Sequence, residues 1–352
     1  MNLDTEKRNN VTVDYLKAIA CITVVLQHCL SYILSKQTEG FTLLTELYSY
    51  SSKLNVPLFF MISGYLLHQQ PIGIFMKKKI PRLLIPFFFF SGLKLIYSLF
   101  ISDEFAHGGS VQSQLYKAFA VGELYWFSYS ILLMFLIAPL IWKTKTIVRG
   151  NKKYELPIIA IVCFVLLIIF NTVNKQYNIV TFPYMFQIDR TITYIPFFLA
   201  GFIWRNIYPI IGDIKKTSAV VLFILSLPLI WSARKIEMFV YFTSTCVSVL
   251  LCMDIWLLVK PFKKIPFVLR MVSKYTYQVF FIDSFVKIII FTLIEKLVGT
   301  TIYQNLAICL LIVLSEVFAD VCLSCIISFI AEKIPIINIL FGLSKTSIKA
   351  KK

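Results

Sequence analysis

The first apolar stretch of the sequence carries three residues that could do chemistry, Asp14, Lys17 and His28. Histidine titrates near neutral pH, so His28 can accept and release a proton, and the Lys17 ammonium can hold an anion. These two residues lie eleven positions apart, which brings them within about 20° of alignment on one helix face, separated by roughly 16 Å of rise. A shared polar face indicates a lined cavity. The alternatives are that His28 hydrogen-bonds to a neighbouring helix and that Lys17 extends its ammonium group to the membrane interface.

Two pairs of ionisable residues lie in the apolar stretches near the C-terminus. Asp283 and Lys287 are spaced i, i+4, and so are Glu316 and Asp320, so each pair shares a helix face. Ion pairing between the two helices would explain both pairs. The functional alternative is a carboxylate that orients a catalytic base or lines a pore.

A basic cluster follows the second apolar stretch. Lys79 and Arg82 lie three residues apart and could hold a phosphate-bearing ligand, although the anchoring of a cytoplasmic loop predicts the same residues. The three histidines of the chain have no matching Cys or acidic spacing, so we expect no metal site.

The composition indicates which elements must position these residues. Of the 352 residues, 58% are hydrophobic and only 15% are charged, and the mean hydropathy is +0.79. An ordinary soluble domain carries about 25% charged residues. The composition therefore excludes a soluble, a disordered or a disulfide-stapled secreted protein. The eight cysteines all lie in apolar stretches, which favours buried thiols, the Cys322–Cys325 pair included.

We expect an all-α, polytopic membrane protein with about ten transmembrane helices in one domain, residues 1–352. Basic residues concentrate in the tails and in the loops on one side, which predicts that both termini are cytoplasmic. The same distribution explains the net charge of +17, so nucleic-acid binding is not expected. The predicted spans are residues 13–34, 54–70, 82–102, 124–142, 156–173, 191–208, 218–232, 240–259, 276–298 and 303–331.

Motifs along nearly the whole chain resemble those of the acyltransferase 3 family, membrane acyltransferases that modify cell-surface polysaccharides in bacteria. The stretch from Asp14 to His28 is similar to the family's first helix, which has an aspartate, Leu-Arg, Val-Val and a histidine. Residues 55–67 (NVPLFFMISGYLL) resemble the family's second helix, and residues 79–86 resemble its basic-x-x-Arg motif. Residues 123–127 resemble the start of its fourth helix. Near the C-terminus, residues 273–283 resemble its Tyr-rich stretch that ends in His, and residues 334–335 and 341–342 resemble its closing segment.

The chain departs from the family pattern at two positions. Lys17 stands where the family often has Arg, which keeps the charge but loses the planar fork. Asp283 stands where many members have a second His. Asp283 cannot replace that His as a neutral base, but it can orient another group.

The resemblance implies transfer of an acyl group, usually acetyl, from cytoplasmic acyl-CoA, a co-substrate and not a bound cofactor. The acceptor would be a hydroxyl of an extracytoplasmic cell-surface glycan or lipid-linked glycan precursor. Such a hydroxyl needs a general base, and His28 is the candidate. Direct transfer and a route through an acyl-enzyme both stay open. The predicted donor-binding residues are Lys17, Lys79 and Arg82. The predicted supporting or pore-lining residues are Asp14, Trp126, Asp283 and Glu316.

The expected location is the bacterial plasma membrane, with several spans and with membrane lipid among the partners. The competing interpretation is a transporter or flippase for a lipid-linked glycan or a small anion, which would use the same buried charges as a substrate path. No internal sequence repeat supports this alternative. A third interpretation is a non-catalytic partner of a glycan-assembly complex.

Overall fold

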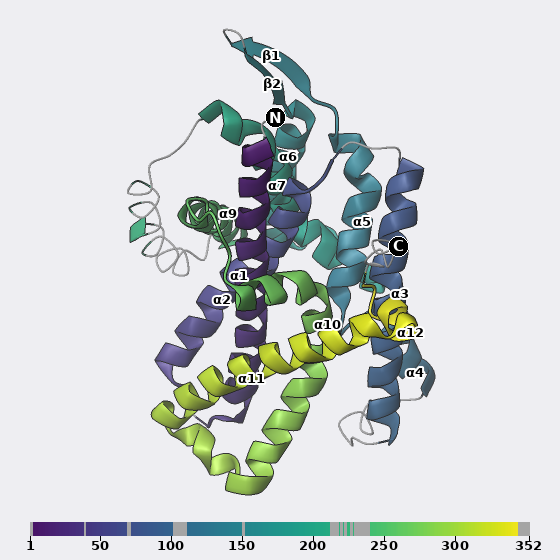
Figure 1. Ribbon diagram of the computed structural model, residues 1–352, viewed down its shortest axis with the longest axis vertical. Helices are drawn as coiled ribbons and strands as arrows, with labels where there is room; N and C mark the ends of the chain where they lie inside the picture. Colours follow the sequence, from purple (N-terminus) through teal and green to yellow (C-terminus); the bar gives the residue numbers. More distant parts are fainter. Residues whose placement is uncertain are drawn as a thin grey trace, which may run out of the picture.

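The computed structural model describes residues 3–38, 40–68, 72–100, 111–149, 152–211 and 240–343, and a few positions between 218 and 228. It is almost entirely α-helical, as predicted (Figure 1). The long helices are α1 (Leu3–Lys36), α2 (Thr42–Tyr65), α3 (Ile72–Phe100), α5 (Trp126–Ile141), α6 (Ile158–Tyr177), α7 (Ile188–Ile211), α9 (Val240–Val259), α10 (Phe267–Val298) and α11 (Leu306–Lys333). The short helices are α4 (Val111–Leu115), η2 (Tyr116–Val121), η3 (Met185–Gln187), η4 (Thr300–Gln304) and α12 (Pro335–Leu340).

Each predicted span except 218–232 falls on one of these long helices, and 218–232 lies largely outside the described residues. Within the described part of the chain, six helices are long and apolar enough to cross a membrane, or seven if α4–η2 and α5 form one bent span. Helices α2 and α7 are not among the six. Polar residues of both helices lower their hydropathy, and several of those residues line the cavities described below.

Several helices begin well before the membrane spans predicted within them. Helix α2 begins at Thr42 rather than at 54, and α10 begins at Phe267 rather than at 276. Helix α3 begins at Ile72 and continues through Pro81 and Pro86, although we expected a loop before residue 82. Apolar composition marks the part of a helix that can lie in hydrocarbon, and the helix itself continues into the polar interface. Proline is tolerated inside membrane helices because neighbouring groups satisfy the backbone that it frees.

A small antiparallel hairpin is an element that the all-α prediction missed. It consists of β1 (Lys145–Arg149) and β2 (Lys152–Leu156), with Lys145 opposite Leu156. The hydroxyl of Thr146 donates a hydrogen bond of 3.0 Å to the Glu155 carboxylate across the strands. In Figure 1 the hairpin lies at the same end of the molecule as the N-terminal end of α1.

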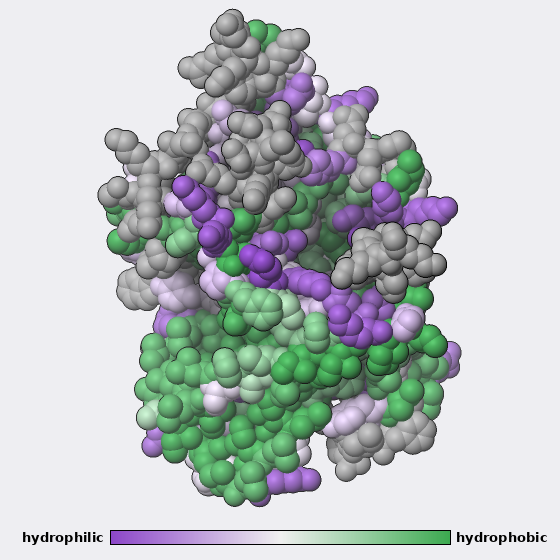
Figure 2. Space-filling model, viewed as in Figure 1, coloured by the Kyte–Doolittle hydropathy of each residue, from purple (hydrophilic) through white to green (hydrophobic). Residues whose placement is uncertain are grey.

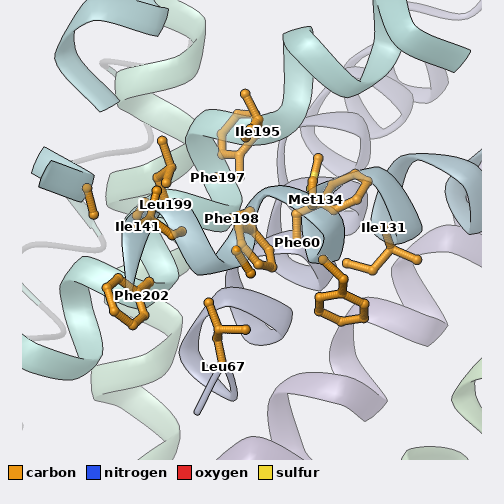
Figure 3. Close-up of a cluster of buried hydrophobic side chains, with 14 of the residues drawn as sticks. Phe60, Leu67, Ile131, Met134, Ile141, Ile195, Phe197, Phe198, Leu199 and Phe202 are labelled. Atoms are coloured by element: carbon orange, nitrogen blue, oxygen red, sulfur yellow. The ribbon is translucent and has the colours of Figure 1, made fainter. Parts of the chain in front are cut away.

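The largest buried cluster joins α2, α5 and α7. Figure 3 shows Phe60 of α2 among residues of α5 and α7, with Met134 and Phe198 close to it. All three side chains are fully buried. Helix α1 packs against α2 on one side and against α10 and α11 on the other. This arrangement places the predicted site residues of α1 in the interior of the helix bundle.

Glycines set the distance between α2 and α7. A Cβ atom at Gly64 would lie 1.8 Å from the carbonyl oxygen of Phe198, and one at Gly201 would lie 1.8 Å from that of Met61. Neither backbone can move aside without disturbing its helix. Small residues at such crossings allow membrane helices to approach closely.

We therefore expect Gly64→Ala to destabilise the protein by about 1–3 kcal/mol or more, because the added methyl group overpacks this crossing. Gly92→Ala in α3 is the matched control, because nothing lies within 4 Å of a Cβ atom at Gly92. The measurement is the thermal unfolding temperature of each variant in detergent. Equal unfolding temperatures for the two variants would contradict the proposed tight crossing.

The surface agrees with a membrane environment. Figure 2 shows a mostly hydrophobic surface over the lower part of the view, where Figure 1 places α10 and α11, and hydrophilic residues gather above it. On α11, Leu311, Leu314 and Phe318 are each about 70% exposed. Water-soluble monomers rarely expose apolar patches of such extent. Contact with lipid accounts for this surface.

Candidate active site

One cavity, called here the inner cavity, has a volume of about 410 Å³ and brings the predicted donor-binding residues together. Lys17 of α1 and Lys79 and Arg82 of α3 line its wall. Lys274 and Glu332 also line it and form an ion pair of 2.6 Å. The sequence predicts that all five residues lie near the cytoplasmic ends of their membrane spans.

Asp14 supports the wall of the inner cavity without lining it. The Ser273 hydroxyl donates a hydrogen bond of 2.8 Å to the Asp14 carboxylate, and Ser273 lines the cavity. Asp14 and Lys17 are spaced i, i+3 on α1, so their opposite charges lie on neighbouring positions of one face. This contact ties α1 to α10 beside the Lys17 ammonium.

A second cavity, called here the outer cavity, has a volume of about 560 Å³. His28 of α1 and Trp126, the first residue of α5, line it, together with Arg190 and Tyr194 of α7. Asn55 of α2 also lines it and donates a hydrogen bond to the Gln27 side chain next to His28. We expected Lys17 and His28 to face one cavity, and the structure assigns them to two.

The two cavities meet at three apolar residues. Val24, Val56 and Phe280 line both of them. Val24 lies one helical turn before His28 on α1. These three side chains therefore mark where the inner cavity, with its basic wall, adjoins the outer cavity, which holds the histidine.

Asp283 holds the ring of His28 in place. The Nδ1 atom of His28 donates a hydrogen bond of 2.6 Å to the Asp283 carboxylate. Asp283 is only 1% exposed, whereas the His28 side chain is 37% exposed. Because Nδ1 is engaged by the carboxylate, Nε2 is the ring nitrogen that can take a proton from a molecule in the outer cavity.

The expected ion pairing between α10 and α11 is wrong. No ion pair within the described residues joins Lys287 to the acidic residues of α11, and Asp283 pairs with His28 instead. Glu316 and Asp320 are fully buried on α11 and line neither cavity, although both act electrostatically on Asp283. Among the described residues, no group of three or more His, Cys, Asp or Glu side chains is placed to hold a metal ion.

Sequence reasoning missed several residues that line the two cavities. Arg190 directly precedes a predicted span, a position where charged residues are common, so it carried no signal that could have identified it. Its guanidinium lies over the Trp126 ring, 5.0 Å from the ring centre. Lys274 and Glu332 had no signal either, because both fall at predicted helix ends, where charged side chains are common.

Comparison with known proteins identifies the family. The sequence model of the acyltransferase 3 family, described as an acyltransferase domain, matches residues 10–331, nearly the whole chain. No curated protein and no solved structure matches the chain significantly. The matched region contains the lining residues of the outer cavity and those of the inner cavity except Glu332, Gly342 and Leu343. The chain therefore belongs to the acyltransferase 3 family, and it is a membrane-embedded acyltransferase.

Proposed function

We propose that the chain transfers an acyl group, most commonly acetyl, from cytoplasmic acyl-CoA to a hydroxyl of a cell-surface glycan or of its lipid-linked precursor, in a bacterial plasma membrane. The observation that carries this proposal is that His28, held by the buried Asp283, lines the outer cavity one helical turn from Val24, which also lines the inner cavity. A base at this position serves a reaction whose two substrates arrive from opposite sides.

The inner cavity suits the acyl donor. CoA carries phosphates, which Lys79 and Arg82 can bind, and Arg can do so with two parallel hydrogen bonds. Its long pantetheine arm would extend past Lys17 toward Val24, Val56 and Phe280. The thioester carbonyl would then lie between the two cavities.

The outer cavity suits the acceptor. We propose that His28 Nε2 removes the proton from an acceptor hydroxyl while the hydroxyl oxygen attacks the thioester carbonyl carbon. The new C–O bond forms, the C–S bond breaks, and the leaving CoA sulfur receives the proton from His28. Asp283 stabilises the imidazolium formed between these two steps. Direct transfer of this kind requires no acyl-enzyme.

The proposal is tested with sealed membrane vesicles that contain the protein and glycan acceptor. Labelled acyl-CoA is supplied on the cytoplasmic face, and ester-linked label is measured on glycan at the opposite face. Transfer of label is the expected result. Glycan movement that is independent of acyl-CoA, with no labelled ester, would overturn the proposal in favour of the transporter.

Arg82→Gln is expected to raise the KM for acyl-CoA about tenfold or more, because a charge-assisted contact to phosphate is lost. The preference of the enzyme for acyl-CoA over its 3′-dephospho analogue should fall as well. Lys78→Gln is the matched control, since Lys78 is exposed on the same helix and does not line the cavity. Steady-state kinetics with both donors check this, and an equal KM change in the two variants would contradict it.

A further inference from the structure

The outer cavity carries a cation that the proposed reaction does not use. Arg190 lines the cavity from the first turn of α7. Within the described part of the chain, no carboxylate lies within ion-pairing distance of its guanidinium. A positive charge in a cavity of a membrane protein is costly, so an Arg without a partner there is a candidate for ligand binding.

Aromatic rings fix the position of this guanidinium. Arg190 lies 5.0 Å from the centre of the Trp126 ring, and the Trp126 and Tyr194 rings are 5.2 Å apart with an interplanar angle of 31°. When the flat face of a guanidinium packs on an aromatic ring, the N–H donors at the edge of the guanidinium remain free to bind a ligand. Those donors match the two oxygens of a carboxylate or a phosphate.

The other charges of the cavity do not neutralise Arg190. Lys175, at the exposed end of α6, adds a second cation. Among the described residues that line the cavity, Asp189 is the only carboxylate, and it lies in the first turn of α7, where the helix dipole stabilises an anion. The described lining residues therefore contribute two cations and one anion, a net positive charge that favours an acidic ligand.

We infer that the outer cavity selects an acceptor glycan that carries an oxyanion, a carboxylate or a phosphate, which binds the Arg190 guanidinium against Trp126. The sugar bearing this group then presents a neighbouring hydroxyl to His28, which lines the same cavity. The inference rests on the proposed function, in that it treats the outer cavity as the acceptor side. Arg190 acts here in binding and specificity, and it does not take part in the proton transfer.

The experiment compares two matched acceptors, an oligosaccharide ending in glucuronic acid and its counterpart ending in glucose, with the purified protein in phosphatidylcholine vesicles. Binding is measured by calorimetry, and acyl transfer from acetyl-CoA is measured separately. We expect the wild type to prefer the acidic acceptor about tenfold or more, as one charge-assisted contact implies. Arg190→Gln should remove this preference, and Arg190→Lys should retain part of it.

Lys296→Gln is the matched control, because Lys296 is an exposed cation at the end of α10 and lines neither cavity. Its preference should equal that of the wild type. Equal binding of the two acceptors by the wild type would overturn the inference. So would an equal loss of both acceptors in Arg190→Gln, since that result points to a structural role.

Two further outcomes separate the inference from its alternatives. Binding preference without any acyl transfer would support the anion site and count against the proposed function alone. Vesicles that contain phosphatidylglycerol test whether a lipid phosphate occupies Arg190 instead. An unchanged preference in these vesicles supports the glycan, and its disappearance would overturn the inference in favour of a lipid headgroup.

Discussion

Replacing His28 with Ala is expected to lower the rate of acyl transfer by about two to four orders of magnitude, the usual contribution of a general base. The physical reason is that an acceptor hydroxyl is a poor nucleophile until a base takes its proton. His28 lies on the outer cavity with Nδ1 engaged by Asp283, so only Nε2 is available for this proton. The measurement is kcat/KM with labelled acyl-CoA at equal amounts of folded protein.

His28→Asn separates catalysis from packing. Removing the ring altogether leaves the buried Asp283 carboxylate without its donor, and such a change can destabilise a protein strongly. The amide nitrogen of Asn can donate to Asp283 from nearly the place of Nδ1, but it supplies no base. We expect His28→Asn to keep the wild-type unfolding temperature and to lose activity as His28→Ala does.

His68 offers a matched control for the histidine substitution. It follows α2, its side chain is exposed, and its Nδ1 atom forms a hydrogen bond with the carbonyl oxygen of Leu66. His68→Ala should keep the wild-type rate. A His28→Asn protein that is folded and as active as the wild type would exclude His28 as the base.

The membrane character of the chain could be predicted from the sequence, whereas the exact helix bounds could not. Apolar composition identifies the stretches that can lie in hydrocarbon, and nearly all of the predicted spans fall on helices. Composition does not mark where a helix begins. Helix α2, for example, begins twelve residues before the predicted span, in a stretch of mixed polar and apolar residues. The hairpin at β1–β2 had a local signal, the β-branched run Thr146-Ile147-Val148 followed by Gly-Asn, which an all-α expectation passed over.

The site could be predicted only in part, because its decisive contact is not local. Lys17, Lys79 and Arg82 were grouped by their charge and position, and the structure brings them to one cavity. The residues His28 and Asp283 lie 255 positions apart, and no spacing rule connects them. The sequence indicated that Asp283 can orient another group, and the packing of α1 against α10 supplies that partner.

The second large effect is expected at Asp283. Asp283→Asn should lower kcat by about two to four orders of magnitude and leave the KM for acyl-CoA nearly unchanged. An amide can present its NH₂ group to Nδ1, which favours the imidazole tautomer with the proton on Nε2, and that tautomer cannot accept the proton of the acceptor. The substitution also removes the charge that stabilises the imidazolium. The KM should not change because Asp283 lines neither cavity.

Asp320→Asn is the matched control for the loss of a buried carboxylate. Asp320 is as deeply buried as Asp283 and lies beside it on the neighbouring helix, but the Ser324 hydroxyl, rather than His28, donates a hydrogen bond to it. We expect it to lower kcat by less than about tenfold, since it acts on His28 only through Asp283. Asp283→Glu should recover part of the activity, because it restores the charge and an acceptor for Nδ1. Equal kcat losses in Asp283→Asn and Asp320→Asn, without recovery in Asp283→Glu, would mean that Asp283 serves the packing of α10 and not the orientation of the base.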